Sequence, residues 1–252
     1  IKYNNKFEKA SWNEVYNIIK SKIKNTNKDK ICGFVGDLTN METSFILKEF
    51  FQRTLNSDKI ESRSDDRFVD ISERQNYIFN STINGIEEAD LILLLGSNPR
   101  FEATMVNARI RKAYVNNNTQ IISLNNVGDL TYPYENLDGK TQTIKDIFDN
   151  NHLISKKILE AKKPIVILGE SFFNTKSASY LFYSLKEFLI NNKKFHSDWN
   201  PLNILSTDAA TVGNFDLDIL CNTSNLIQDL RENKFEIVFL IGQDDLKFKK
   251  KK

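Results

Sequence analysis

Short, uninterrupted hydrophobic runs alternate along the chain with segments of helical periodicity. Four of these runs end at or near a glycine: 30–36 (KICGFVG), 89–98 (ADLILLLGSN), 163–170 (KPIVILGE) and 236–245 (EIVFLIGQDD). A run without polar interruption is typical of a parallel strand that is covered on both faces. Two shorter strands are expected at 120–124 and 202–205.

Helical patterns separate these predicted strands. Ser11 and Glu14 form a capping box in front of a stripe of hydrophobic residues. Further helices are expected from Thr39 or Asn40 onward, at 101–114 behind Pro99, and at 153–162, 177–191 and 224–231. The segments 128–140 and 212–220 are interpreted as loop or irregular structure. The segment 58–73 is interpreted as a loop or a crossing between domains, and 72–83 as weakly helical. Recurring strand–glycine–helix units predict right-handed crossovers and an α/β fold with a mostly parallel sheet.

Composition narrows the functional classes. The chain has 252 residues, of which 40% are hydrophobic, and its formal net charge is +2. These values exclude a disordered chain, and so small a charge does not indicate a nucleic-acid partner. The longest unbroken apolar run, Leu91–Leu95, is far shorter than the roughly 18–20 residues of a membrane span. The basic end, 247–252, is interpreted as a solvated tail, with binding to an anionic partner as the alternative.

Metal-binding side chains are scarce. The chain contains two cysteines, Cys32 and Cys221, and two histidines, His152 and His196. An iron–sulfur cluster needs about four thiolates, so this chain alone lacks the ligands for one. The histidines have no partner at a metal-ligand spacing, which argues against a zinc site. The low cysteine count also favours a reducing compartment.

The densest polar group follows the run at 89–98. Arg100 and Glu102 lie at the predicted strand–helix turn, and Arg109 and Arg111 follow on the helix. Such arginines can bind a phosphate or carboxylate near a helix N-terminus, or form structural ion pairs, and both interpretations stay open. None of the glycine turns is a dinucleotide-binding or P-loop motif.

Two further groups are open to more than one interpretation. Asp244 and Asp245 can bind ribose hydroxyls or a cation at the end of a strand, or cap the following turn. Trp12 and Trp199 are interpreted as anchors of a core or of a domain interface.

The block 79–112 (FNSTINGIEEADLILLLGSNPRFEATMVNARIRK) carries a family resemblance. It resembles the molybdopterin-oxidoreductase-type domain of the large iron–sulfur subunit of respiratory complex I. Further segments follow in the order of that family: 11–14 (SWNE), 129–133 (DLTYP), 161–170 (AKKPIVILGE), 199–205 (WNPLNIL), 209–217 (AATVGNFDL) and 239–245 (FLIGQDD). The resemblance covers nearly the whole chain.

The resemblance implies two Rossmann-like lobes, one inserted in the other. By analogy, residues 1–66 and 200–252 form the first lobe and residues 67–199 the inserted one. In related molybdenum enzymes, the loops that match 96–99 and 242–245 face the pterin nucleotides. The candidates for a vestigial pocket are therefore Ser97, Asn98, Arg100, Glu102, Gln243 and Asp244. In complex I the domain is understood to carry no molybdenum cofactor, so the resemblance implies no cofactor, metal or catalytic residue in this chain.

A scaffold in the peripheral arm of complex I is the implied role. The iron–sulfur clusters and FMN are then expected in partner chains, and the cluster-bearing N-terminal half on a separate chain, unless the sequence is a truncated form. The implied location is the matrix side of the mitochondrial inner membrane, or the cytoplasmic face of a bacterial inner membrane. Two alternatives stay open: a molybdopterin- or nucleotide-binding oxidoreductase domain, and a free-standing anion-binding module that uses Arg100, Arg109 and Arg111.

Overall fold

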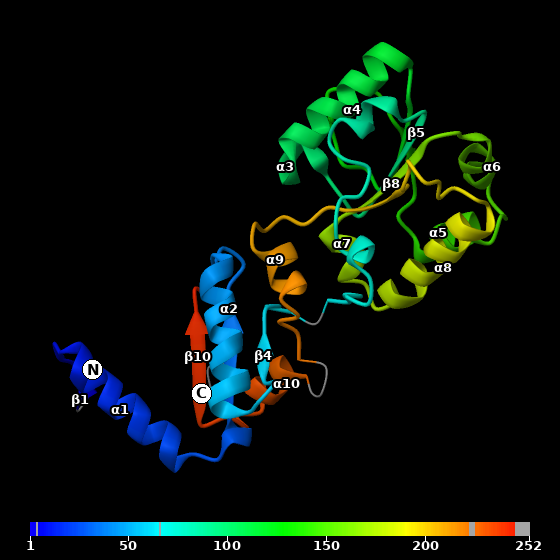
Figure 1. The fold of residues 1–252 in the computed structure, drawn as a ribbon. Coiled ribbons are helices and arrows are strands. Elements are labelled where there is room, and N and C mark those ends of the chain that lie inside the picture. The colour runs from blue at the N-terminus through cyan, green and yellow to red at the C-terminus, as the bar shows by residue number, and fades with distance from the viewer. Residues whose placement is uncertain (4, 66, 222–224, 245–252) are drawn as a thin grey trace. The chain divides into compact units, whose positions relative to one another are not determined.

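The computed structural model describes residues 1–3, 5–65, 67–221 and 225–244. It divides into two compact units, unit 1 (residues 1–66 and 213–252) and unit 2 (residues 67–212) (Figure 1). Each unit is built on a parallel sheet. The expected α/β class with two mostly parallel sheets is confirmed.

Unit 2 contains five parallel strands in the order β7-β6-β5-β8-β9. The strands are β5 (Leu91–Leu95), β6 (Gln120–Leu124), β7 (Glu135–Leu137), β8 (Pro164–Leu168) and β9 (Leu202–Ile204). All five residues of β5 are buried. Leu91, Leu93 and Leu95 point into one hydrophobic cluster, and Ile92 and Leu94 into the other. The sheet therefore has a core on each face, as its uninterrupted apolar sequence predicts.

Helices cover both of these faces. The helical segments of unit 2 are η3 (Arg74–Asn76), η4 (Gly85–Glu88), α3 (Pro99–Glu102), α4 (Thr104–Asn117), α5 (Thr141–Phe148), α6 (Leu153–Glu160), α7 (Glu170–Phe173) and α8 (Ala178–Asn191). Buried residues of α5, α6, α7 and α8 join the cluster of Leu93, whereas those of α4 join the cluster of Ile92.

Unit 1 contains three parallel strands in the order β10-β3-β4. Its strands are β3 (Ile31–Val35), β4 (Ile60–Glu61), β10 (Ile237–Ile241) and a short antiparallel pair, β1 (Lys2–Tyr3) and β2 (Lys6–Phe7). Its helical segments are α1 (Trp12–Asn25), η1 (Lys28–Lys30), α2 (Met41–Glu49), the π-helical η2 (Phe50–Leu55) and α10 (Leu226–Arg231). The helix α9 (Thr211–Asp216) begins in unit 2 and ends in unit 1.

The predicted capping box is present at the start of α1. The Ser11 side chain accepts a hydrogen bond from the Glu14 backbone N–H at 3.3 Å. However, none of the α1 residues is buried, and Trp12 is 73% exposed and stacks on Tyr16. The expectation of a core anchor is wrong for Trp12. It holds for Trp199, which is 6% exposed and donates its indole N–H to the Pro164 carbonyl at 2.9 Å.

Several local expectations differ from the structure. The predicted helix behind Pro99 is interrupted at Ala103, whose backbone leaves the helical conformation (φ −154°, ψ 74°). The segment 128–140, interpreted as a loop, includes β7, and 212–220 includes most of α9. Of the segment 72–83, expected to be weakly helical, only the short η3 is helical.

The chain returns from unit 2 to unit 1 between residues 212 and 213. From the sequence, the chain was expected to return to the first lobe between residues 199 and 200. That position lies within unit 2. The reason is β9, which pairs with β8 in the five-stranded sheet. Asp245 and the basic end at 247–252 lie outside the described residues. In the part of the chain that is described, no helix is both long and apolar enough to span a bilayer.

Candidate functional site

The carboxyl ends of parallel strands are where ligands bind in open α/β sheets. In unit 2, β5 and β8 end side by side at Gly96 and Gly169, and the Gly169 N–H donates to the Leu95 carbonyl at 2.9 Å. A Cβ on Gly169 would lie 2.3 Å from the Gly96 carbonyl oxygen, and one on Gly96 would lie 2.5 Å from the Phe172 nitrogen. The absent side chains therefore let the two strand-end loops pack against each other.

Two vestigial-pocket candidates lie directly behind Gly96. Ser97 is buried, and its hydroxyl donates to the Glu102 carboxylate at 3.0 Å. The Asn98 amide donates to the Val127 carbonyl at 2.9 Å. The other amide atom, Asn98 Oδ1, is buried and has no hydrogen bond from any described residue. The Ser97 hydroxyl and one N–H of the Asn98 amide are thus bound within unit 2.

Ion pairs hold two of the three candidate arginines. Arg100 Nη1 lies 2.6 Å from the Asp129 carboxylate and also donates to the Asp129 carbonyl. Arg109 forms an ion pair with Glu87. Arg111 is exposed on α4. Because Arg100 and Arg109 face different carboxylates, the structure does not bring the arginines together around one anion.

The pKa of the Asp129 carboxyl is expected to rise in an Arg100→Ala variant. In the wild-type chain, the Thr131 backbone N–H and then the Arg100 guanidinium stabilise the carboxylate and lower its pKa. The shift contributes stability above the ordinary pKa of aspartate, and this contribution is lost as the pH falls through the lowered value. Titration of the carboxyl carbon by NMR measures the change. An unchanged pKa would show that the pair does not form in solution.

The carboxyl end of the unit 1 sheet is also filled by the chain itself. A Cβ on Gly36 would lie 1.6 Å from the Gly242 carbonyl oxygen. The Thr39 hydroxyl donates to the Ile241 carbonyl at 3.1 Å and stands 2.6 Å from where a Gly242 Cβ would be. The turns behind β3 and β10 are therefore in direct contact.

Two further vestigial-pocket candidates, Gln243 and Asp244, follow Gly242. Gln243 is buried, and its amide donates to the Val35 carbonyl at 3.4 Å. Asp244 is exposed. The sequence placed these residues at the end of a strand, and the structure agrees, but the Gln243 side chain points back to the neighbouring strand.

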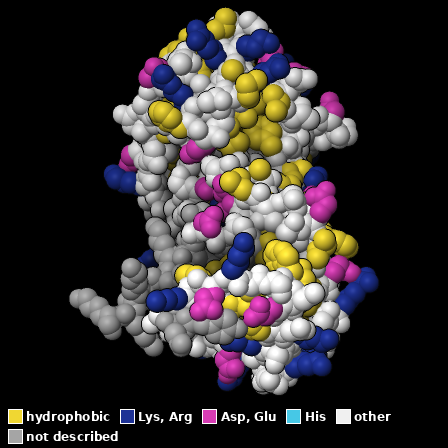
Figure 2. All heavy atoms as spheres, turned by 90° about the vertical axis from the view of Figure 1, so that its left-hand side faces the viewer, with side chains coloured by type: hydrophobic (Ala, Val, Ile, Leu, Met, Phe, Trp, Pro, Cys, Tyr) yellow, Lys and Arg dark blue, Asp and Glu magenta, His cyan; other side chains and the backbone are white. Residues whose placement is uncertain are grey.

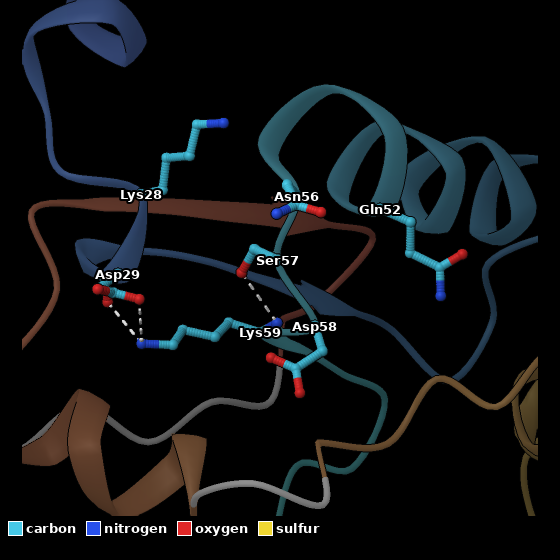
Figure 3. Close-up of a pocket in the computed structure, with 7 residues that line it drawn as sticks. All are labelled: Lys28, Asp29, Gln52, Asn56, Ser57, Asp58 and Lys59. Carbon is cyan, nitrogen blue, oxygen red and sulfur yellow. Dashed lines mark hydrogen bonds and ion pairs between the residues drawn. The ribbon is translucent and has the colours of Figure 1, made fainter.

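A polar pocket of about 370 Å³ lies at the opposite, amino end of the unit 1 sheet (Figure 3). It is lined by Lys28, Asp29, Gln52, Asn56, Ser57, Asp58 and Lys59. The Lys59 ammonium lies 3.6 Å from the Asp29 carboxylate and donates to the Asp29 carbonyl at 2.8 Å. Sequence reasoning missed this pocket, because its residues lie in two polar segments that give no motif. Its acidic and basic groups neutralise each other.

Among the residues that the structure describes, the face drawn in Figure 2 has no region of a single charge that would indicate a binding surface for a charged partner. Lysine and arginine side chains are spread there among aspartate and glutamate side chains. Hydrophobic side chains also reach this surface, some of them in groups. The distribution agrees with the small net charge of +2.

Comparison with known proteins places the chain in a family. A family model described as molybdopterin oxidoreductase matches residues 1–252. The chain belongs to the molybdopterin oxidoreductase family. The resemblance to the large iron–sulfur subunit of complex I, drawn from the block 79–112, is likewise confirmed by its relatives.

Relatives of this family member come from mitochondria and bacteria. The chain is 31% identical over 268 residues to the NADH-ubiquinone oxidoreductase 75 kDa subunit of Reclinomonas americana, covering 100% of this chain and 38% of that protein. It is 33% identical to the mitochondrial NADH-ubiquinone oxidoreductase 78 kDa subunit of Candida albicans, covering 98% and 34%. It is 30% identical to a subunit of the NADH-quinone oxidoreductase of the bacterium Rickettsia bellii, covering 100% and 36%. The chain thus spans about a third of the length of these relatives.

The family name implies a molybdopterin cofactor, and the described residues do not fit one. A pterin nucleotide at the end of a strand needs free N–H and O–H donors and close approach of its phosphates to the backbone. In each unit the strand-end glycines contact the chain's own backbone. The Ser97 hydroxyl and one amide N–H each of Asn98 and Gln243 donate to acceptors of the chain, and the unpartnered Asn98 Oδ1 is an acceptor.

Metal-ligating residues of this family member are dispersed. Within the described residues, no three side chains of the types His, Cys, Asp and Glu converge to hold a metal ion. His152 instead caps α6, accepting the Ile154 N–H on Nδ1 at 3.2 Å. Cys32 lies within β3, and burial raises the pKa of its thiol to about 12.

The Cys32 thiol is expected to resist iodoacetamide at about pH 8 while the chain is folded, because the thiolate is the reactive form and Cys32 is fully buried. Its raised pKa stabilises the folded state below the ordinary thiol pKa, and that contribution is lost as the pH rises toward the folded value. Mass spectrometry after labelling, with and without denaturant, measures the reaction. Labelling of the folded chain at the rate of a free thiol would contradict the buried position.

Proposed function

We propose that this chain is a structural part of the large iron–sulfur subunit in the peripheral arm of respiratory complex I, the assembly that transfers electrons from NADH to ubiquinone. In this proposal the chain contributes shape and buried surface, but no cluster ligand and no catalytic residue. The iron–sulfur clusters and FMN belong to partner chains. One partner carries the cluster-bearing N-terminal half of the subunit, and the others are further peripheral-arm subunits.

One observation carries the proposal: the strand-end loops that face a ligand in an open α/β sheet here face each other. Gly36 and Gly242 in unit 1, and Gly96 and Gly169 in unit 2, give close contact between neighbouring turns. Polar candidates at these ends bind acceptors in their own unit. This arrangement supports a domain that keeps the family's fold while its ligand edge serves packing.

The proposed location follows the relatives. Their names include mitochondrial and bacterial complex I subunits. We therefore assign the chain to the matrix side of the mitochondrial inner membrane, or, for a bacterial source, to the cytoplasmic face of the inner membrane.

Affinity purification of the chain from solubilised membranes tests the proposed function. Mass spectrometry is expected to recover the flavoprotein subunit and a cluster-bearing chain in amounts equal to this chain. Metal analysis of the chain separated from its partners is expected to show neither iron nor molybdenum. Recovery of the chain alone as a monomer, or of bound molybdenum with a guanine nucleotide, would overturn the proposal.

A further inference from the structure

The two units arrange their strands in the same order. In unit 2 the first strand, β5, is central, with β6 and β7 on one side and β8 and β9 on the other. In unit 1 the first strand of the parallel sheet, β3, has β4 on one side and β10 on the other. The strand β10 therefore has the position in unit 1 that β8 has in unit 2. Among the described residues, however, β10 pairs with β3 alone, and no strand takes the position of β9.

The two equivalent strands have the same kind of sequence but different burial. Both β8 (PIVIL) and β10 (IVFLI) are uninterrupted apolar runs that lead into a glycine. Such a run is typical of a strand that has neighbours on both sides and a layer on both faces. All five residues of β8 are buried, whereas none of the five in β10 is.

The registers identify the equivalent positions. Pro164 pairs with Leu91 of the central strand in unit 2, and Ile237 pairs with Ile31 of the central strand in unit 1. Ile167 lies three residues after Pro164, and Leu240 lies three residues after Ile237, so the two occupy equivalent positions. Ile167 is fully buried, and Leu240 is 44% exposed.

The strand β8 is enclosed in unit 2 by its neighbouring strand and by a cluster on each face. Ile167 itself lies in the cluster of Trp199 and Leu205, on the face opposite to α8. β9 pairs in parallel with Val166, Ile167 and Leu168, the last three residues of β8. The helix α8, which lies between β8 and β9 along the chain, buries six of its residues, five of them in the same cluster as Val166 and Leu168. By contrast, β10 lies on the side of β3 away from β4 (Figure 1), and no described strand pairs with its outer edge. An edge strand of this kind exposes unpaired N–H and C=O groups that can pair with a further strand.

We propose that the edge of β10 away from β3 binds a parallel strand with apolar side chains, preceded by a helix, from the part of the large subunit outside residues 1–252. The incoming strand pairs with Phe239, Leu240 and Ile241, as β9 pairs with the last three residues of β8. The relatives contain ample sequence for such a segment, because the chain covers only 34–38% of three of them. The identity of the partner rests on the proposed function, whereas the open edge rests on the comparison of the two units.

A photoreactive amino acid at position 240 tests this proposal in the assembled complex. Irradiation is expected to join it to an apolar peptide of the large subunit from outside residues 1–252. The same photoreactive amino acid at Leu153, which is 74% exposed on α6, is the control and is expected not to capture that peptide. Capture of a second copy of this chain, of a different subunit, or of no peptide would overturn the proposal.

Substitutions at Leu240 give an independent readout. Leu240→Asp is expected to lower incorporation into the complex about tenfold, because the incoming strand would bury a charge. Leu240→Ile keeps an apolar, strand-forming side chain and is expected to assemble like the wild type. Equal incorporation of both variants would contradict the proposal.

The two tests also separate this proposal from the proposed function. If the wild-type chain does not copurify with complex I at all, the proposed function fails. If it copurifies but neither test at position 240 succeeds, only the proposal for the edge of β10 fails.

Discussion

Replacing Gly96 with alanine is expected to lower the free energy of unfolding of unit 2 by about 3 kcal/mol. Gly96 has a φ of 64°, a left-handed conformation that disfavours any side chain. The new Cβ would also stand 2.5 Å from the Phe172 nitrogen, a backbone atom that moves only if α7 moves. Both effects act on the contact between the ends of β5 and β8. Urea denaturation followed by the fluorescence of the buried Trp199 measures the loss.

Gly128→Ala is the matched control for this substitution. Gly128 has a similar φ of 77°, but a Cβ built there meets no atom within 4 Å. Its expected loss is about 1 kcal/mol, from the backbone conformation alone. The difference between the two variants isolates the close approach of the strand-end loops. Equal losses would mean that the loops leave room for a side chain, and would remove the observation on which the scaffold proposal rests.

The long buried strands were predictable because their signal is local. β3, β5, β8 and β10 are all uninterrupted apolar runs that end at a glycine, and each has the strand type that this pattern predicts. The sequence signal is weak for short strands whose stability comes mainly from pairing with a neighbouring strand. β4 has only two residues, and β7 (Glu135–Leu137) contains no run of apolar residues. Both form because a neighbouring strand offers hydrogen-bonding partners, which sequence periodicity does not record.

The place of the candidate residues in the fold was predictable from the sequence, but their contacts were not. Glycines at the ends of strands correctly located the carboxyl edge of each sheet. The sequence did not reveal that Arg100 faces Asp129, because the two residues are 29 positions apart. It also did not distinguish a glycine that makes room for a ligand from one that makes room for another loop. That distinction depends on which backbone lies opposite, as the Gly96 carbonyl lies opposite Gly169.

Trp199→Ala is expected to destabilise unit 2 by about 4 kcal/mol. The indole lies in the hydrophobic cluster on the α4 face of the sheet, and its N–H donates to the Pro164 carbonyl. The Lys163 ammonium also lies 5.1 Å from the centre of the ring. Truncation leaves a cavity and removes the donor to the first residue of β8. Trp199→Phe retains most of the buried area and is expected to cost about 1 kcal/mol, the net value of the lost hydrogen bond. Urea denaturation followed by circular dichroism measures both variants.

The Trp12→Ala variant shows how much the effect of replacing a tryptophan depends on its burial. Trp12 is the other tryptophan of the chain, but it is 73% exposed and contacts Tyr16 on the same helix. Its replacement is therefore expected to change the free energy of unfolding by no more than about 0.5 kcal/mol. A loss as large as that of Trp199→Ala would place Trp12 in a core and contradict the exposed position of α1. Replacing the same amino acid thus has a large expected effect at one position and almost none at the other, because Trp199 is buried and Trp12 is exposed. The sequence pattern did not distinguish these two environments.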